Sequence, residues 1–128
     1  MRIGRLAAYA TASLIAGASV FWAAPAQAAW ESCPSGYGCF YRLHYGNNSS
    51  GHFQFAGDNG NWNVYGVTGE DSSAYDNGTS SLYLNIYDYN GHAKYCMTRT
   101  HKLGWVGNMG GSNFWSTSRN TTCNVDGL

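Results

Sequence analysis

The chain has 128 residues, with seven Lys and Arg residues, seven Asp and Glu residues and a formal net charge of zero. Two of the basic residues lie in the first five positions, so the rest of the chain is mildly acidic and lacks the dense positive patch of a nucleic-acid-binding domain. Seventeen glycines and many Asn and Ser residues interrupt the chain, so long helices are not expected.

The first segment has the organisation of a signal peptide. Arg2 and Arg5 precede an apolar run over 6–22, and Ala26-Gln27-Ala28 is a small-residue cleavage site. A transmembrane anchor is the alternative, but the Ala-rich run and the cleavage site favour removal. We therefore predict a signal peptide over 1–28 and a secreted, extracellular domain over 29–128. No later segment is long and apolar enough to hold a membrane.

Short strands are predicted throughout the exported domain. The clearest is 81–88, in which Leu82, Leu84 and Ile86 lie on one face and Tyr83, Asn85 and Tyr87 lie on the other. The other predicted strands cover 38–45, 52–56, 62–65, 92–97 and 114–117. Short strands at this spacing indicate an all-β antiparallel sandwich or barrel.

Four cysteines lie in the exported part. An even number in a small secreted chain predicts two disulfides, and four cysteines allow three pairings. Cys33 and Cys39 enclose a turn-rich segment that can fold back, so we pair them and assign Cys96 to Cys123. A zinc site is the alternative, but the C-x2-C spacing is absent and export favours oxidation.

A weak internal repeat runs through the domain. Gly51-His52-Phe53 matches Gly91-His92-Ala93 at an offset of about 40 residues, and Ser73 matches Ser112 at nearly the same offset. Two four-stranded units are therefore predicted. In each unit a hydroxyl near the serine position would bond the backbone of a folded hairpin.

These landmarks resemble the βγ-crystallin Greek-key motif. The chain is also similar to the exported proteins grouped with the Streptomyces metalloproteinase inhibitor, through CPSGYGC at 33–39, FYRL at 40–43, DSS at 71–73, DNG at 76–78 and GSNFW at 111–115. The resemblance implies a βγ-crystallin-like sandwich of two Greek keys, at about 33–80 and about 81–125, that is stapled by two disulfides and works as a monomer.

The resemblance also implies a secreted peptidase inhibitor that acts on extracellular metalloproteases. Its partner would be the extracellular protease, to which it presents a rigid surface loop. The inhibitory prototype carries that loop inside a short disulfide ring in its second motif. Cys96 and Cys123 are 27 residues apart, so no such ring exists in this chain. The candidate loop is His101, Lys102, Leu103 and Gly104; the alternative for this segment is an ordinary surface turn between strands.

The resemblance suggests one candidate cofactor, calcium. Asp76-Asn77-Gly78-Thr79-Ser80-Ser81 fits the oxygen-rich calcium segment of βγ-crystallins, with Asp76, Asn77 and Ser81 as the ligand candidates. In the register of the repeat, however, Ser73 and Ser112 hold the equivalent serine position, and neither copy supplies a leading carboxylate there. A polar turn is therefore the alternative, and no cofactor is expected.

No catalytic motif is present in the sequence. The four histidines form no H-E-x-x-H pair, and no G-x-S-x-G segment occurs, so an enzyme is not expected. The rival function is a non-inhibitory extracellular module that binds cell-wall glycan or calcium, with outward tyrosines such as Tyr83 and Tyr87 stacking on sugar rings.

Overall fold

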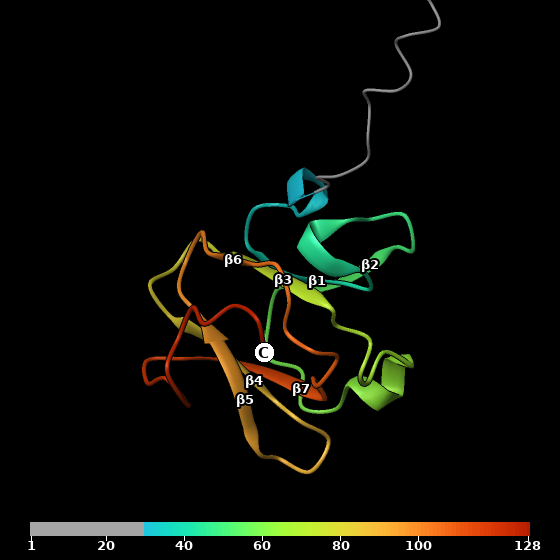
Figure 1. Cartoon of the computed structure of the whole chain (residues 1–128). Helices are drawn as coiled ribbons and strands as arrows, with labels where there is room; N and C mark the ends of the chain where they lie inside the picture. The colour runs from blue at the N-terminus through green and yellow to red at the C-terminus, as the bar shows by residue number, and fades with distance from the viewer. Residues whose placement is uncertain (1–29) are drawn as a thin grey trace, which may run out of the picture.

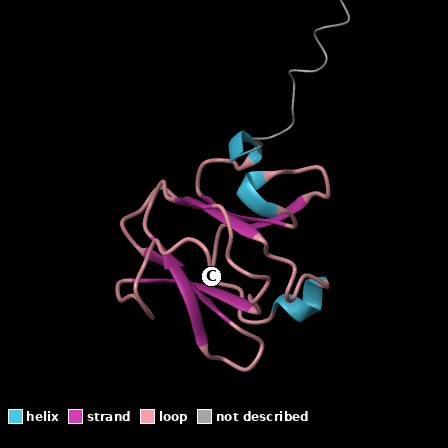
Figure 2. Cartoon of the chain, viewed as in Figure 1, coloured by secondary structure: helices cyan, strands magenta, loops and turns pink. Residues whose placement is uncertain are grey.

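The computed structural model describes residues 30–128, which fold into two antiparallel β-sheets connected by loops (Figure 1). The predicted signal peptide over 1–28 lies outside these residues. The strands are β1 (Tyr37–Tyr41), β2 (His52–Phe55), β3 (Ser73–Asn77), β4 (Tyr83–Tyr87), β5 (Ala93–Met97), β6 (Lys102–Leu103) and β7 (Ser112–Ser116). Helix is confined to three short 3-10 turns, η1 (Trp30–Ser32), η2 (His44–Gly46) and η3 (Trp62–Tyr65) (Figure 2). The predictions of an all-β fold and of two disulfides are confirmed.

The two sheets exchange edge segments between the halves of the chain. The first sheet has the order β2-β1-β3-β6, so it takes β6 from the second half. The second sheet has the order β5-β4-β7, and Asn59 from the first half forms an isolated antiparallel bridge with Asn113 in β7. Each sheet is therefore completed by a segment from the other half, which ties the two halves together.

Backbone hydrogen bonds also join the halves directly. The N–H of Gly69 donates to the carbonyl of Gly110 at 2.8 Å, and the N–H of Asn108 donates to the carbonyl of Asp71 at 2.7 Å. The N–H of Val106 donates to the carbonyl of Ser72 at 2.8 Å. Since buried backbone groups need partners, this ladder fixes the relative position of the segments that lead into β3 and β7.

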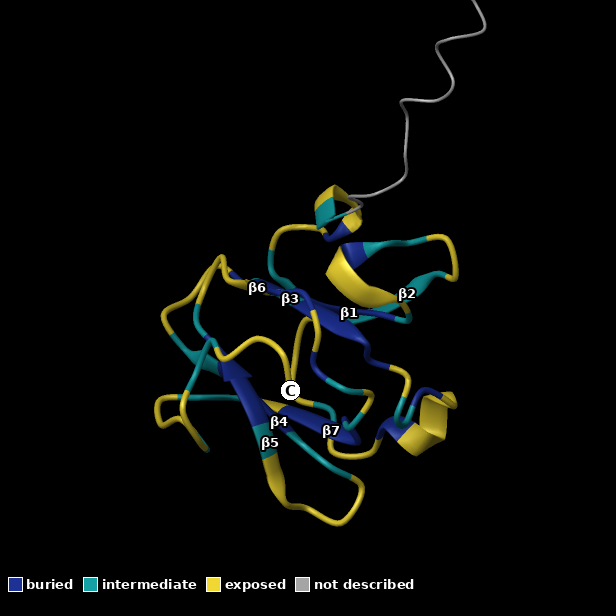
Figure 3. Cartoon of the chain, viewed as in Figure 1, coloured by how far each residue is buried: buried dark blue, intermediate teal, exposed yellow. Residues whose placement is uncertain are grey.

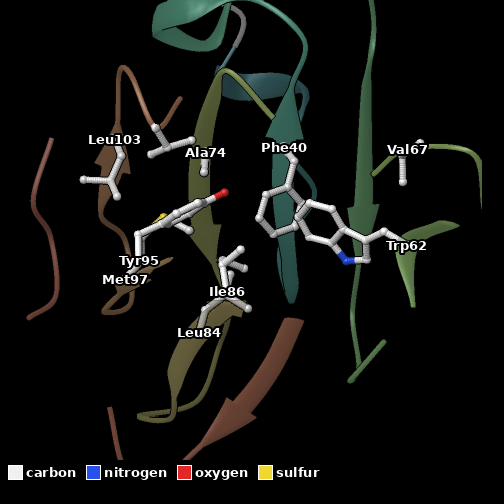
Figure 4. Packing of buried hydrophobic residues seen from close by; sticks show 10 residues of the cluster. Phe40, Trp62, Val67, Ala74, Leu84, Ile86, Tyr95, Met97 and Leu103 are labelled. Carbon is white, nitrogen blue, oxygen red and sulfur yellow. The ribbon is translucent and has the colours of Figure 1, made fainter. Parts of the chain in front are cut away.

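The core lies between the sheets and contains residues from both (Figure 4). It is formed by the buried residues Phe40, Trp62, Val67, Ala74, Leu84, Ile86, Tyr95, Met97, Leu103 and Val106. Leu84 and Ile86 alternate along β4, as the predicted strand over 81–88 requires. Figure 3 shows that the buried residues are concentrated in the strands, while most residues of the connecting loops are exposed or intermediate.

The outer face of each sheet is covered by a segment that a disulfide holds in place. Before β1, Cys33 pairs with Cys39, and the ring of Trp30 packs edge-on against Tyr41 at 5.3 Å. After β7, Cys123 pairs with Cys96 in β5. Both predicted pairings are thus confirmed. Because each cover buries side chains that face away from the core, the disulfides stabilise the second layer of packing in addition to constraining the unfolded chain.

Asn85 organises the cover of the second sheet. Its side-chain amide donates to the carbonyl of Ser118 at 2.8 Å, and its oxygen accepts from the N–H of Asn120 at 3.2 Å. Asn85 is only 2 % exposed, so both of its hydrogen bonds are needed to offset the burial of the amide.

Two predicted strands differ from the structure, and two observed strands were not predicted. The predicted strand over 62–65 is the 3-10 turn η3, since the Asn61 side chain accepts from the N–H of Asn63 and Gly66 adopts the left-handed conformation that ends the turn. The predicted strand over 38–45 stops at Tyr41, because the chain turns at Tyr45 and Gly46, which both have positive φ. Strands β3 and β6 were not predicted as strands.

Ser73 fastens this turn to β3. Its hydroxyl donates to the carbonyl of Leu43 at 2.6 Å and accepts from the N–H of Gly46 at 2.9 Å. The predicted bond between a late serine and a folded hairpin is therefore present in the first unit. Ser112 occupies the matching register, opposite Tyr87, but its hydroxyl makes no hydrogen bond within residues 30–128.

Candidate functional site

The segment predicted as a reactive loop, residues 101–104, lies at the edge of the first sheet. Lys102–Leu103 is strand β6, which pairs antiparallel with β3. Leu103 is 1 % exposed and belongs to the core, and Gly104 is also buried. Only His101 and Lys102 are exposed, and the Lys102 ammonium lies over the ring of Tyr75 at 4.9 Å. A protease would have to pull this segment out of the sheet before it could be bound as a peptide.

A different segment, which we name the 61–66 loop, has the features of a presented surface. Trp62 anchors it from within the core, where its indole N–H donates to the side chain of Asn113 at 2.9 Å. The backbone of Trp62 also accepts from the N–H of Val67, which is itself buried. Both ends of the loop are therefore fixed in the interior while its middle lies outside.

The middle of the 61–66 loop carries two apolar side chains in solvent. Val64 is 74 % exposed and Tyr65 is 63 % exposed. A hollow of about 300 Å³ lies beside the loop, lined by Gly60, Asn61, Asp88, Tyr89, Gly91, Gly111 and Ser112. The exposed side chains of Val64 and Tyr65, on an anchored turn beside a polar pocket, form a surface that suits contact with another protein.

The alternation of apolar and polar side chains over 62–65 predicts a strand, so the hydrophobic pattern hides this loop. Two signals mark it as a turn instead. Asn61 precedes the segment at the N-cap position, and Gly66 follows it at the position where a left-handed residue ends a helix.

The three calcium candidates have different environments. The carboxylate of Asp76 is buried and accepts from the N–H of Gly78 at 2.9 Å. Asn77 uses both ends of its amide, because it donates to the carbonyl of Cys33 at 2.9 Å and accepts from the hydroxyl of Tyr75 at 3.2 Å. Ser81 is exposed in the linker before β4. Calcium binding at these residues stays a prediction of the sequence.

Asp71 forms a buried polar contact at the junction of the two halves. One carboxylate oxygen accepts from the hydroxyl of Tyr95, and the other accepts from the N–H of Gly110 at 2.8 Å. Burial raises the pKa of Asp71 to about 6, although both hydrogen bonds oppose that rise. Burial also raises the pKa of Tyr95 well above its usual value, and the neighbouring carboxylate adds to the effect.

Asp76 is the second carboxyl with a raised pKa, also to about 6, and burial is again the main cause. The N–H of Gly78 and the positive charge of Arg99 act in the opposite direction. The second carboxylate oxygen of Asp76 is buried without a hydrogen-bond partner among residues 30–128. Two buried carboxyls thus give this small domain a pH-dependent stability.

The histidines have local partners on the surface. Both ring nitrogens of His52 lie within hydrogen-bond distance of side-chain amides, at 2.9 Å from Asn48 and 2.8 Å from Gln54. His92 lies 3.4 Å from the carboxylate of Asp88. These contacts orient the imidazole rings of His52 and His92 against neighbouring polar side chains.

Aromatic side chains reach the surface of the domain at several places. Tyr83 and Tyr87, the predicted sugar-stacking residues, are half-buried, and the ring of Tyr87 packs against Phe114 at 5.8 Å. Trp115, by contrast, lines an open cleft at the other end of β7. Trp105 is 46 % exposed and stacks on the ring of His44 at 5.0 Å.

Comparison of the chain with known protein families, with curated proteins and with solved structures finds no match. Within residues 30–128, His, Cys, Asp and Glu side chains form no group of three or more that could hold a metal ion. The same part of the chain contains no helix with the length and apolar character needed to span a membrane.

Proposed function

We propose that this chain is a secreted inhibitor of extracellular metalloproteases, built on two crystallin-like Greek keys, and that the 61–66 loop is its protease-contacting surface. The exchange of strand β6 and of the isolated bridge at Asn59 between the sheets supports a paired Greek-key arrangement, in which each motif contributes an edge segment to its partner's sheet. The two disulfides support an oxidising, extracellular location.

The observation that carries the proposal is the exposed Val64–Tyr65 pair on a turn whose ends are anchored in the core. A preorganised loop loses little conformational entropy on binding, so its apolar contacts convert efficiently into affinity. The disulfide-held covers on both sheets keep the scaffold rigid behind it.

The helical shape of the 61–66 loop supports inhibition by a loop that is not itself a substrate. Proteases bind the peptides they cut in an extended form, whereas Trp62–Tyr65 is a 3-10 turn with internal hydrogen bonds. The loop would therefore block the active-site cleft without being cleaved. This differs from the cut-resistant substrate loop that the sequence suggested at residues 101–104.

The test is a titration of the oxidised protein, residues 29–128, against a thermolysin-type metalloprotease and a subtilisin-type serine protease. We expect stoichiometric loss of metalloprotease activity on a small substrate, with the inhibitor recovered intact. Val64→Asp should raise the inhibition constant at least about tenfold, which corresponds to roughly 1.4 kcal/mol. Val125→Asp is the matched control, since Val125 is also exposed but lies in the C-terminal segment.

Unchanged activity of both proteases at a large excess of folded protein would refute inhibition of these classes. Equal effects of Val64→Asp and Val125→Asp would show that inhibition occurs through another surface. A metalloprotease that cleaves the chain within residues 101–104 would restore the first candidate loop.

A further inference from the structure

A cleft of about 370 Å³ opens beside β7, and we name it the Trp115 cleft. Its lining includes Gly36, Asp58, Gly78, Thr79, Leu82 and Trp115. These residues come from the turn before β1, the segment after β2, the linker before β4 and β7. The volume lies at the lower end of the roughly 300–1,000 Å³ typical of small-ligand sites, which suits a mono- or disaccharide-sized ligand.

Trp115 is held in one position and supplies the aromatic wall. Its backbone N–H donates to the carboxylate of Asp58 at 2.8 Å. Its ring packs against glycine backbone, because a methyl group at Gly78 would lie 2.8 Å from the ring and one at Gly38 would lie 3.5 Å from it. A methyl group at Gly38 would make only ordinary contact with the ring, so it is glycine at position 78 that lets the indole lie this close to the backbone.

Oxygen-bearing groups surround this wall. Asp58 uses one carboxylate oxygen for Trp115, and its other oxygen makes no hydrogen bond to the described residues. The hydroxyl of Thr79 is also without a partner in residues 30–128, and both residues are exposed. The guanidinium of Arg99 donates to the carbonyl of Thr79 at 3.1 Å, which steadies this edge of the cleft.

A fixed aromatic ring, a carboxylate oxygen and a free hydroxyl are the groups that recognise a pyranose ring. A sugar with equatorial substituents presents a face of C–H groups that can stack on an indole, while its hydroxyls point sideways to hydrogen-bond acceptors and donors. Because Asp58 is an exposed residue of the cleft lining, its negative charge would repel a phosphate or a uronic acid, whereas a neutral hydroxyl or amide N–H could donate to its carboxylate.

We propose that the Trp115 cleft binds neutral β-linked pyranose saccharides, such as oligomers of glucose or N-acetylglucosamine, with the sugar ring stacked on Trp115 and its polar edge held by Asp58 and Thr79. This site uses none of the residues that present Val64 and Tyr65, so it is independent of protease inhibition. It gives the domain a means to stay on a polysaccharide surface.

The test is an NMR titration of the 15N-labelled, oxidised protein with N-acetylchitotriose and, separately, with cellotriose. We expect at least one of them to bind with a dissociation constant of about 1 mM or below and to shift the Trp115 indole N–H and the amides of Gly57, Gly78 and Thr79. Trp115→Ala should weaken binding at least about tenfold, and Trp115→Phe should retain most of it.

Milder variants keep the test valid if Trp115→Ala does not fold. Asp58→Asn keeps an oxygen that accepts from the N–H of Trp115 but removes the charge, and it should lower the affinity at least about threefold, as should Thr79→Ala. Trp105→Ala removes an exposed aromatic ring elsewhere and should leave the affinity unchanged.

Three results would overturn the proposal. The first is the absence of shifts with both saccharides up to their solubility limits. The second is binding that Asp58→Asn and Thr79→Ala both leave unchanged. The third is binding that Trp105→Ala abolishes. Retention on insoluble chitin or cellulose, lost in Asp58→Asn, would identify a polymer surface as the source of the saccharide, whereas binding of the soluble trisaccharides alone would identify free oligosaccharide.

Discussion

Ser73→Ala removes the hydroxyl that fastens the turn after β1 to strand β3. Ser73 is fully buried, and its hydroxyl serves two backbone groups at once, the carbonyl of Leu43 at 2.6 Å and the N–H of Gly46 at 2.9 Å. The turn also contains Tyr45, a non-glycine residue at φ 55°, which costs stability and persists only where neighbouring contacts hold it. Alanine at position 73 would leave both backbone groups without their partner.

The expected loss of stability follows from the two unsatisfied groups. A buried donor or acceptor that loses its partner costs roughly 1–3 kcal/mol, and relaxation of the turn recovers part of this, so we expect about 2–4 kcal/mol. For a domain with a total stability of roughly 5–15 kcal/mol this is a large fraction. The melting temperature should fall by about 8–32 °C, at roughly 4–8 °C per kcal/mol for a domain of this size.

The assay is urea unfolding of the oxidised protein, followed by tryptophan fluorescence and far-UV circular dichroism. Ser112→Ala is the matched control, because the two serines hold equivalent positions in the repeat. Of the two side-chain hydroxyls, only that of Ser73 makes hydrogen bonds within residues 30–128. We expect Ser112→Ala to cost less than about 1 kcal/mol. Equal losses for the two variants, or a loss below about 1 kcal/mol for Ser73→Ala, would refute the reasoning.

Three further predictions concern stability. Burial raises the pKa of Asp71 from 3.8 to about 6, so the folded state holds the proton of this carboxyl more tightly than the unfolded chain does. The free energy of unfolding should therefore fall as pH rises through 4–6, by at most roughly 3 kcal/mol for Asp71. Asp76 acts in the same direction. Urea unfolding at pH 4.5 and 7 checks this, and Asp71→Asn should flatten the profile, whereas a rise in stability over this range would contradict it. Gly110→Ala places a methyl group 2.2 Å from the Trp62 ring and should cost at least about 2 kcal/mol by thermal melting, while Gly57→Ala, which meets open space, should cost little. Reduction of both disulfides should lower the melting temperature, since each contributes roughly 2–5 kcal/mol, and an unchanged melt would contradict the packing of the two covers.

The strands with regular alternation could be predicted from the sequence, and the strand made mainly of polar residues could not. The 81–88 pattern identified β4 because Leu84 and Ile86 alternate with polar or aromatic residues. Strand β3 contains buried Ser73 and Asp76, whose polar groups are bonded to segments distant in the sequence or to the following turn. A local pattern of polar residues looks like a loop when its partners are supplied only by the tertiary fold.

The loops of the candidate site were also not predictable from the local hydrophobic pattern. Residues 101–104 follow a strand and contain a lysine, so the sequence favoured an exposed loop, but pairing with β3 buries Leu103. Residues 62–65 alternate apolar and polar side chains, so the sequence favoured a strand, but the caps at Asn61 and Gly66 close a turn there. In both cases the capping and edge-pairing groups outweigh the hydrophobic pattern, and only the capping residues are visible in the sequence.

The exchange of edge segments means that this domain can be divided into two complementary fragments. The linker between β3 and β4 is exposed at Thr79, Ser80 and Ser81. Neither disulfide crosses it, because Cys33–Cys39 lies wholly before the linker and Cys96–Cys123 wholly after it. A cut there would give one fragment that lacks β6 and another that lacks the bridge from Asn59, each with an open sheet edge shaped for the other. Neither half buries a complete core alone, so assembly of the fragments would restore the fold, and the pair could report the meeting of two proteins fused to them.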